Sequence, residues 1–179
     1  MKKILILSAS PRKGGNSDIL CDEFIRGANE AGNKPEKIFL REKKIGCCIA
    51  CDYCKENAGK CSQNDDMAEI LEKMIAADVI VLATPVYFYT MSAQLKTVID
   101  RTVARYTEIT GKEFYFIVTA ADTSKANMQK TIDGLRGFTE MCLDGAVEKG
   151  VILGTGAWQA GEIRRTPAMK EAYTMGKKV

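Results

Sequence analysis

Hydrophobic residues gather in short runs along the chain, and these runs predict strands. They lie at Lys3–Ser8, Asp78–Ala83, Phe114–Thr119 and Val147–Leu153. The first three are nearly continuous, which is typical of parallel strands covered on both faces. Polar residues and a glycine interrupt the fourth run, so the pattern does not fix where that strand starts. A weaker run, Lys37–Leu40, predicts an edge strand.

Between these runs, apolar residues recur at helical spacing. The pattern predicts helices at Asn16–Ala31, Asp65–Ala76, Met91–Val103, Asn127–Cys142 and Pro167–Gly176. Ser17 and Asp65 are the expected N-caps of the first two helices, and Gly32 is the expected stop of the first. Alternating strands and helices predict right-handed βαβ units. We therefore expect an α/β fold, a flavodoxin-like three-layer sandwich with a five-stranded parallel sheet in the order 2-1-3-4-5.

The 179 residues predict a single domain, residues 1–179, with a cysteine-rich insert at about 45–64. A net charge of +3 argues against nucleic acid and membrane surfaces as partners. The chain has no histidine, which excludes Ser-His-Asp and Cys-His catalysis and histidine metal ligands. The chemistry therefore depends on cysteine, carboxylate, hydroxyl or backbone groups, or on a bound cofactor.

Cysteine usage and the N-terminal pattern indicate the compartment. Seven cysteines are an odd number, which argues against a disulfide framework. The N-terminal apolar run, Ile4–Leu7, is shorter than a signal peptide requires. No stretch approaches the roughly 20 apolar residues that span a bilayer. We expect a cytoplasmic protein in which clustered cysteines serve metal or redox chemistry.

The loop after the first predicted strand is rich in hydroxyl groups and glycine and leads directly into a helix. Its polar side chains are Ser8, Ser10, Asn16 and Ser17. Free N–H groups at a helix N-terminus favour an anion, and hydroxyl groups suit a phosphate monoester. The loop contains neither GxxxxGK[ST] nor GxGxxG. It predicts a phosphate site; a solvated turn with a capping serine is the alternative.

Three further loops lie at the same predicted edge of the sheet. Residues 84–91 contain three consecutive aromatic side chains behind a proline, a surface against which a flat ring packs. A hydrophobic lid or a subunit contact would use the same residues. Residues 119–124 are small and polar and could offer backbone groups to the edge of a ligand. Residues 154–159 predict a flexible loop, with Trp158 as an interface or lid residue.

Several of these segments together resemble a known family. They are Ser10-Pro11-Arg12 with Asn16-Ser17, Thr84-Pro85-Val86-Tyr87, and Gln94-Leu95-Lys96 with Asp100-Arg101. In this order they resemble the NAD(P)H-dependent FMN reductase superfamily, and the cysteine insert resembles its iron–sulfur flavoprotein branch. The resemblance covers most of the chain, is strongest from Lys3 to Arg105, and is weak after Thr123.

The resemblance implies a bound FMN and a homodimer or dimer of dimers with FMN near a subunit boundary. The residues carried over to the phosphate are Ser8, Ser10, Pro11, Arg12, Asn16 and Ser17. Those carried over to the isoalloxazine ring are Pro85, Val86, Tyr87 and Phe88. Ala121 and Asp122, from the small polar loop, complete the expected cofactor site.

Four cysteines follow a compact spacing, Cys48-x2-Cys51-x2-Cys54-x6-Cys61. This spacing is common among ligands of [4Fe–4S] clusters, and the resembled branch uses the same pattern. Cys47 is a neighbouring alternative to Cys48. A Cys₄ zinc site normally pairs two separated knuckles, so it fits less well; an unfilled site is the other alternative. We expect Cys21 and Cys142 to be buried in helices.

These features predict an FMN-dependent oxidoreductase without a catalytic side chain. Electrons would pass from NAD(P)H, or from the cluster, through FMN to a quinone, an azo compound or an electron-carrier protein. Two alternatives stay open at this stage. One is a flavodoxin-type electron carrier, against which the positive net charge argues mildly, and the other is a thiol-based redox sensor.

Overall fold

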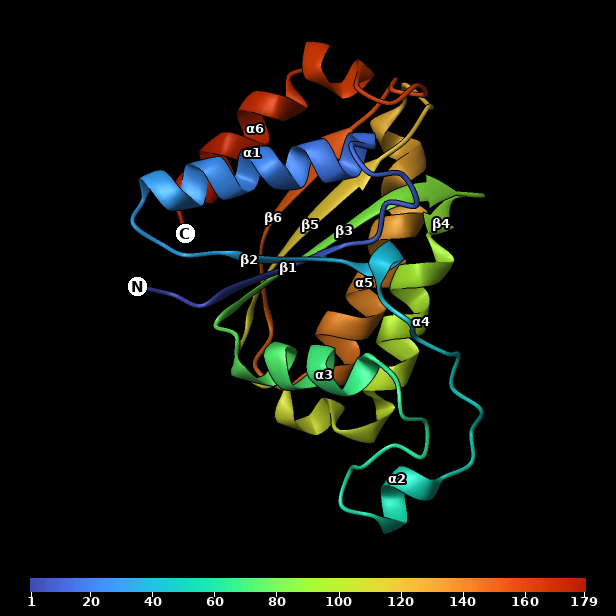
Figure 1. Ribbon diagram of the computed structural model, residues 1–179. Coiled ribbons are helices and arrows are strands. Elements are labelled where there is room, and N and C mark those ends of the chain that lie inside the picture. The colour runs from blue at the N-terminus through green and yellow to red at the C-terminus, as the bar shows by residue number, and fades with distance from the viewer.

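The computed structural model describes all 179 residues and has a parallel sheet at its centre (Figure 1). Its strands are β1 (Ile4–Ser8), β2 (Glu36–Phe39), β3 (Val79–Tyr87), β5 (Glu113–Thr119) and β6 (Val147–Gly154). They are ordered β2-β1-β3-β5-β6 and are all parallel. This confirms the predicted order and the predicted edge position of the second strand.

Helices cover both faces of the sheet (Figure 1). On one face lie α1 (Asn16–Glu30) and α6 (Ala168–Lys177); on the other lie α3 (Met67–Ala76), α4 (Ala93–Arg101) and α5 (Gln129–Cys142). Each face has its own hydrophobic core, because alternate residues of β1 and β3 point to opposite sides. The three-layer α/β prediction is therefore confirmed. No helix has both the length and the apolar character needed to cross a bilayer.

The third strand is longer than the apolar run predicts. It continues to Tyr87, turns through Phe88 and Tyr89, and pairs antiparallel with the short β4 (Thr90–Met91). Met91 therefore belongs to a hairpin, and the following helix begins at Ala93 rather than at Met91. The sequence gives no sign of this hairpin, because neither turn residue is glycine, asparagine or aspartate.

The predicted helix ends are partly correct. Gly32 follows α1 with φ +83°, which confirms it as the stop. Gly15 rather than Ser17 is the N-cap residue of α1, and Ser17 lies inside the first turn. Asp66 rather than Asp65 is the N-cap residue of α3. Asp65 lies one residue earlier and accepts a hydrogen bond from the Met67 N–H at 3.1 Å, so it still satisfies one free donor of the helix start.

An irregularity in β6 explains its broken apolar pattern. Phe114 pairs with Glu148 and Tyr115 pairs with Gly150, so Lys149 is an extra residue in the ladder. This bulge changes which face the side chains occupy. The strand nevertheless begins at Val147, as the sequence predicts.

Helices α1 and α6 touch backbone to backbone through two glycines. A Cβ on Gly27 would lie 2.1 Å from the Tyr173 carbonyl oxygen, and a Cβ on Gly176 would lie 2.0 Å from the Phe24 carbonyl oxygen. Because both obstacles are backbone atoms, neither can rotate away. The glycines therefore set the distance between the two helices on this face.

We expect Gly27→Ala to lower the free energy of unfolding by about 1–3 kcal/mol, since the added methyl group must push α6 away. Gly137→Ala is the matched control. This glycine also lies within a helix, but a Cβ there would meet nothing within 4 Å. The control should raise stability by about 0.5–1 kcal/mol through helix propensity. Equal effects in chemical denaturation would contradict the close-packing account.

Candidate functional site

The loops after β1, β3, β5 and β6 meet at the carboxyl edge of the sheet, where the strand arrows end in Figure 1. Hydrogen bonds join neighbouring loops. The Ala9 N–H donates to the Ala83 carbonyl at 2.9 Å, and the Ser92 hydroxyl donates to the Ala9 carbonyl at 3.2 Å. The Ala120 N–H donates to the Gly154 carbonyl at 2.9 Å. The predicted cofactor segments are thus brought to a single edge.

A buried carboxylate shapes the loop after β1. Asp18 is 5% exposed and accepts hydrogen bonds from the Ser8 hydroxyl at 3.0 Å and from the Gly14 N–H at 3.0 Å. Lys37, from β2, pairs with the same carboxylate at 2.9 Å and also with Asp22. Sequence reasoning missed Asp18 and Lys37, because neither belongs to the hydroxyl-rich pattern.

The environment of Asp18 keeps it ionised. Burial alone raises its pKa, but hydrogen bonds from Lys37 and Gly14 and the charge of Lys37 outweigh that effect. The pKa of Asp18 is therefore lowered from its ordinary value. The loop accordingly has a fixed negative charge beneath it, neutralised by a lysine that reaches across from the neighbouring strand.

The hydroxyl groups of this loop differ in whether they already have a hydrogen-bond partner. Ser8 is fully buried and donates to Asp18, and the Ser10 hydroxyl donates to the Arg12 carbonyl at 2.7 Å. The Ser17 hydroxyl is also buried, in the first turn of α1, yet it has no partner. Leaving a buried hydroxyl unpaired costs about 1–3 kcal/mol, and native proteins rarely do so without a reason.

Gly15 makes close approach to the helix start possible. A Cβ at this position would lie 2.3 Å from the Ser10 oxygen and 2.9 Å from the Arg12 carbonyl oxygen. The N-terminus of α1 also has no side-chain cap. Arg12 is exposed, and Pro11 is partly buried. The loop thus combines free helix N–H groups, an unpaired hydroxyl and an arginine.

Asn16 holds the loop after β6. Its amide nitrogen donates to the carbonyls of Ala157 and Gln159, each at 3.0 Å. Its amide oxygen accepts from the N–H groups of Gly161 at 3.0 Å and Ile163 at 3.4 Å. The predicted phosphate contact of this side chain therefore competes with four bonds that it already makes. The loop after β6, which the sequence predicts to be flexible, is therefore hydrogen-bonded to the start of α1 through this one residue.

The hairpin after β3 presents the aromatic residues. Phe88 is 99% exposed, Tyr87 is 43% exposed, and Pro85 and Val86 are partly buried. Phe88 and Tyr89 have φ of 48° and 62°, a left-handed pair that glycine and asparagine normally supply. Such strain costs on the order of 1–3 kcal/mol per residue and clusters at functional sites. The aromatic side chains thus face solvent at the edge of the sheet, and their contact with a flat ring stays a prediction.

The loop after β5 is ordered by its aspartate. The Asp122 carboxylate accepts from the Ser124 N–H at 2.8 Å and from the Asn127 amide at 2.7 Å. These bonds, with that of Ser124 the larger, lower the pKa of Asp122. Its carbonyl accepts from the Gly156 N–H at 2.9 Å. Ala121 beside it is exposed. Ala121 and Asp122 thus lie in a loop at the carboxyl edge of the sheet, and their contact with a cofactor stays a prediction.

A second candidate site lies in the cysteine insert, which extends away from the layers and contains the short α2 (Tyr53–Glu56) (Figure 1). One cavity of about 140 Å³ is lined by all four predicted ligands. They are Cys48, Cys51, Cys54 and Cys61. Cys47 does not line it; its sulfur lies 3.9 Å from the Thr97 hydroxyl on α4. The cavity therefore favours Cys48 over Cys47.

The four thiols share the cavity but are not arranged as a coordination group. The Cys51 sulfur lies 3.2 Å from the Ser62 hydroxyl. That contact, together with a backbone hydrogen bond from Tyr53, lowers the pKa of the Cys51 thiol. Ala50 and Asp52, on either side of Cys51, have φ of 51° and 55°. The chain thus bends sharply around this cysteine.

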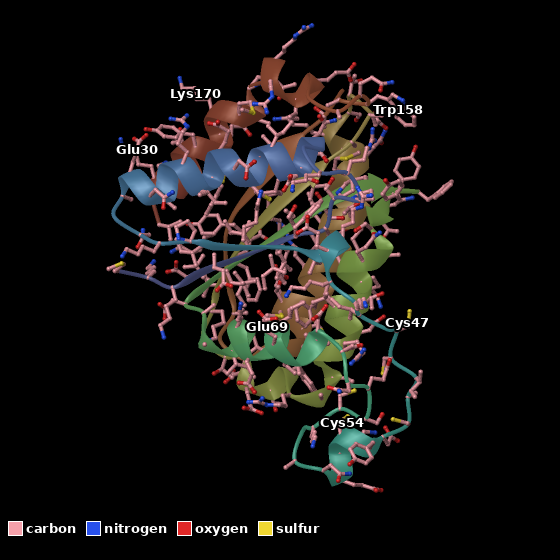
Figure 2. All side chains as sticks on the ribbon, in the orientation of Figure 1. Glu30, Cys47, Cys54, Glu69, Trp158 and Lys170 are labelled. Atoms are coloured by element: carbon pink, nitrogen blue, oxygen red, sulfur yellow. The ribbon has the colours of Figure 1, made fainter.

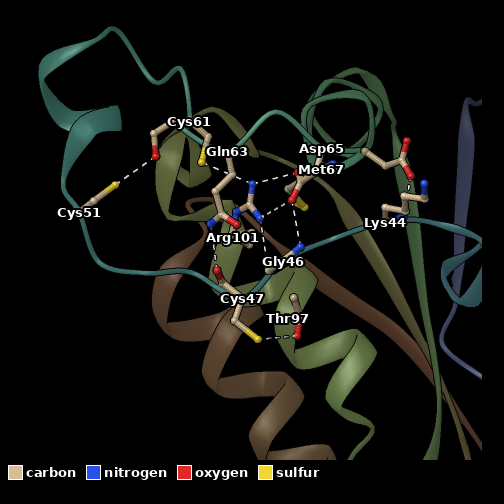
Figure 3. Close-up of polar contacts among 12 residues, drawn as sticks. Lys44, Gly46, Cys47, Cys51, Cys61, Gln63, Asp65, Met67, Thr97 and Arg101 are labelled. Carbon is tan, nitrogen blue, oxygen red and sulfur yellow. Dashed lines mark hydrogen bonds and ion pairs between the residues drawn. The ribbon is translucent and has the colours of Figure 1, made fainter.

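A buried arginine closes the base of the insert (Figure 3). Arg101, at the end of α4, is 3% exposed and binds both carboxylate oxygens of Asp65 at 2.8 and 3.0 Å. It also donates to the Gly46 carbonyl at 2.7 Å and to the Cys61 sulfur at 3.4 Å. Sequence reasoning missed this role, although Arg101 follows Leu95 and Val98 on the apolar stripe of its helix, where a charge signals a buried partner.

Within one chain, the cysteine cavity and the cofactor edge of the sheet lie at opposite ends of α4. Helix α4 begins beside the β3–β4 hairpin, whereas its end and the residues beyond it line the cavity. The nine residues of α4 span roughly 13 Å. Figure 2 shows Cys47 beside α4 and Cys54 farther out, on the short helix α2 of the insert. The insert starts near the cofactor edge, but its cavity lies at the opposite end of α4.

The remaining cysteines differ from each other. Cys21 is fully buried in α1, where burial raises the pKa of its thiol, as expected for an inert core residue. Cys142 is exposed at the end of α5, so the prediction that it is buried is wrong. Position 142 falls on the same helix face as Leu135 and Phe138, but it is the last residue of α5, where the helix leaves it exposed.

Comparisons with known proteins agree with this geometry. The family described as NADPH-dependent FMN reductase matches residues 2–142. An iron–sulfur flavoprotein of Methanocaldococcus jannaschii is 46% identical over 99 residues, 55% of this chain and 51% of that protein. An iron–sulfur flavoprotein of Methanosarcina thermophila is 41% identical over 101 residues, 56% and 52% of the two chains. The chain thus spans about half the length of these relatives.

Among solved structures, an NAD(P)H:quinone oxidoreductase from Methanothermobacter marburgensis superposes with a TM-score of 0.78. The superposition covers 99% of this chain and 95% of that one, at 18% identity. At this identity the similarity establishes the fold.

We expect Asp18→Asn to lower the free energy of unfolding at neutral pH by about 1–3 kcal/mol, because Lys37, Ser8 and Gly14 lose a charged partner. A carboxylate with a lowered folded pKa stabilises above its ordinary value and loses that effect as pH falls through the folded value. The difference from wild type should therefore shrink below about pH 4. Asp22→Asn, at the exposed partner of Lys37, is the control and should cost less than about 1 kcal/mol. A pH-independent difference at Asp18 would contradict this account.

Proposed function

Since the chain belongs to the NADPH-dependent FMN reductase family, we propose that it is an FMN-dependent oxidoreductase that takes electrons from NAD(P)H and passes them to a small-molecule or protein acceptor. We further propose that its cysteine insert holds one [4Fe–4S] cluster. The observation that carries the first proposal is the buried, unpaired Ser17 hydroxyl at the start of α1.

Fewer side chains contact the phosphate in the site that we propose than the sequence pattern predicts. The Ser17 hydroxyl, the free N–H groups of the first turn of α1 and the exposed Arg12 would bind the phosphate. Ser8, Ser10 and Asn16 instead shape the site, because their side chains already bond to Asp18, to Arg12 and to the loop after β6. The residues present therefore fit a phosphate monoester.

The ring would lie against the hairpin, with Pro85 and Val86 forming a wall and Tyr87 and Phe88 excluding water. Ala121 and Asp122 would face its polar edge. Bound FMN supplies hydride acceptance and electron transfer, so the protein has to position and shield the ring. This division of labour agrees with a chain that has no histidine.

The cluster proposal rests on the insert. Four cysteines line one small cavity, and a chain with little apolar content bends around them. The relatives named iron–sulfur flavoproteins support the same assignment. Because the thiols are not arranged as a coordination group, we propose that metal binding and ordering of the insert are coupled.

For the acceptor we propose a quinone, an azo compound or an electron-carrier protein. We also propose a cytoplasmic homodimer or dimer of dimers, in which the exposed aromatic hairpin lies near a subunit boundary.

We expect Ser17→Ala to weaken FMN binding by about ten- to a hundredfold, since a hydrogen bond to a charged group contributes about 1.5–3 kcal/mol. Riboflavin, which lacks the phosphate, should lose little. Stability without ligand should not fall, because the hydroxyl has no partner to lose. Titration calorimetry with both ligands measures these effects.

Thr131→Val is the matched control for this experiment. The Thr131 hydroxyl is also buried and unpaired, but it lies on α5. FMN affinity should be unchanged in this variant. Equal losses for FMN and riboflavin in Ser17→Ala would show that the loop does not hold the phosphate.

The redox proposal is tested with anaerobically reconstituted protein. Wild type should contain FMN, iron and acid-labile sulfide and should oxidise NAD(P)H. Cys51→Ser should lose iron and sulfide, keep FMN and NAD(P)H-driven flavin reduction, and reduce one-electron acceptors more slowly. Cys142→Ser, outside the insert, should behave as wild type. Protein that binds FMN but no iron would overturn the cluster, and flavoprotein that does not oxidise NAD(P)H would favour an electron carrier.

A further inference from the structure

The insert joins the body of the protein through a narrow neck, which we define as residues 44–47 facing residues 63–66. The backbone of Lys44 bonds to Asp66 in both directions, at 2.6 and 3.0 Å. The Gln63 amide donates to the Cys47 carbonyl at 2.9 Å. The Gly46 N–H donates to Asp65 at 2.9 Å. Both ends of the insert are therefore held together just before the cysteines begin.

Arg101 donates hydrogen bonds both to this neck and to a predicted metal ligand. Its two terminal nitrogens make four hydrogen bonds: one to the Gly46 carbonyl, two to the Asp65 carboxylate and one to the Cys61 sulfur. Figure 3 shows the guanidinium between Gly46, Asp65 and Cys61. Arg101 also lines the cavity that the four cysteines share.

We propose that Arg101 is the positioning residue of the cysteine centre: it fixes Cys61 as the fourth ligand and sets the reduction potential of the centre. The proposal rests on the proposed cluster function and goes beyond it. A planar guanidinium has five N–H groups on three nitrogens, so it can bind a carboxylate by two bonds and still donate to a sulfur; a lysine has three donors on one nitrogen and lacks this fork geometry.

Two observations argue against a purely structural ion pair. A pair that served only to close the neck would need Asp65 and Gly46, yet the guanidinium also contacts a thiol. In addition, the Arg101 Nε–H is buried and has no partner, so one donor of the group remains for an acceptor that these residues do not supply. Sulfur at a metal centre is an acceptor of that kind, and hydrogen bonds to such sulfurs shift the potential.

The positive charge of Arg101 predicts in which direction the reduction potential of the cluster shifts. A donor to a ligand sulfur stabilises the more negative, reduced form of a cluster, so its removal should lower the reduction potential. If the preference for the reduced form falls tenfold, the potential of a one-electron centre falls by about 59 mV.

The test compares three variants of anaerobically reconstituted full-length protein: Arg101→Gln, Arg101→Lys and the control Arg105→Gln. Arg105 lies one turn farther on, is more exposed, and pairs with Glu72 and Glu108 rather than with a cysteine. The readouts are FMN content as a check of folding, iron per chain, the cluster potential by redox titration, and proteolysis between residues 45 and 64.

We expect Arg101→Gln to retain FMN, to lose iron at least tenfold faster to a chelator, and to be cleaved faster in the insert. Arg101→Lys, which keeps a charged donor, should bind iron better than Arg101→Gln and should have a potential below that of wild type. Arg105→Gln should match wild type in FMN content, iron retention and cluster potential, because Arg105 donates to no cysteine.

The outcomes separate this proposal from the function on which it rests. If wild type contains no iron and sulfide, the cluster function fails and the role of Arg101 fails with it. If wild type holds the cluster and both Arg101 variants match Arg105→Gln in iron retention and potential, only the role of Arg101 is overturned. If the Arg101 variants lose FMN as readily as iron, Arg101 serves the fold as a whole, and the proposal is likewise overturned.

Discussion

Parallel pairing of β1 with β3 determines where chemistry can occur in this protein. β1 is buried along its whole length and β3 is buried from Val79 to Thr84, so neither offers a side chain to solvent before its carboxyl end. Their backbone groups are satisfied within the sheet, and only the loops beyond their carboxyl ends have free donors. The phosphate loop and the aromatic hairpin are the continuations of these two strands.

Around this edge, some polar side chains shape the loops and others are left to bind a ligand. Asp18 and Lys37 form a buried pair under the phosphate loop, and Asn16 connects that loop to the one after β6. Such groups spend their hydrogen bonds on the protein itself. The unpaired Ser17 hydroxyl and the exposed Arg12 remain for a ligand. The polar residue types in the sequence do not show which side chains shape the site and which bind a ligand. That difference depends on the hydrogen-bond partners that each side chain has in the folded structure.

The sequence predicts most of the fold for a simple reason: short continuous apolar runs such as Ile4–Leu7, alternating with helical patterns, are typical of strands covered on both faces. It does not predict the β3–β4 hairpin, since Phe88 and Tyr89 adopt a backbone conformation that their side chains disfavour. It also leaves out Arg101 and Asp65, whose pairing depends on a helix and a loop that are 36 residues apart. Local patterns establish elements, whereas long-range ion pairs and strained turns depend on the assembled structure. The same limit explains Cys142: its place on the apolar face of α5 predicts burial, whereas the assembled structure leaves this end of the helix exposed.

The narrow neck has a consequence for how this architecture changes in evolution. Gly46, Asp65 and Arg101 hold each other where the insert leaves the body, so the bonds that close the base belong to the body and not to the cysteine loop. A short turn could replace residues 48–62 without removing this closure, and an insert of another length could be grafted at the same point. The cysteine loop is thus a separable module, whose replacement would leave the closure at its base intact.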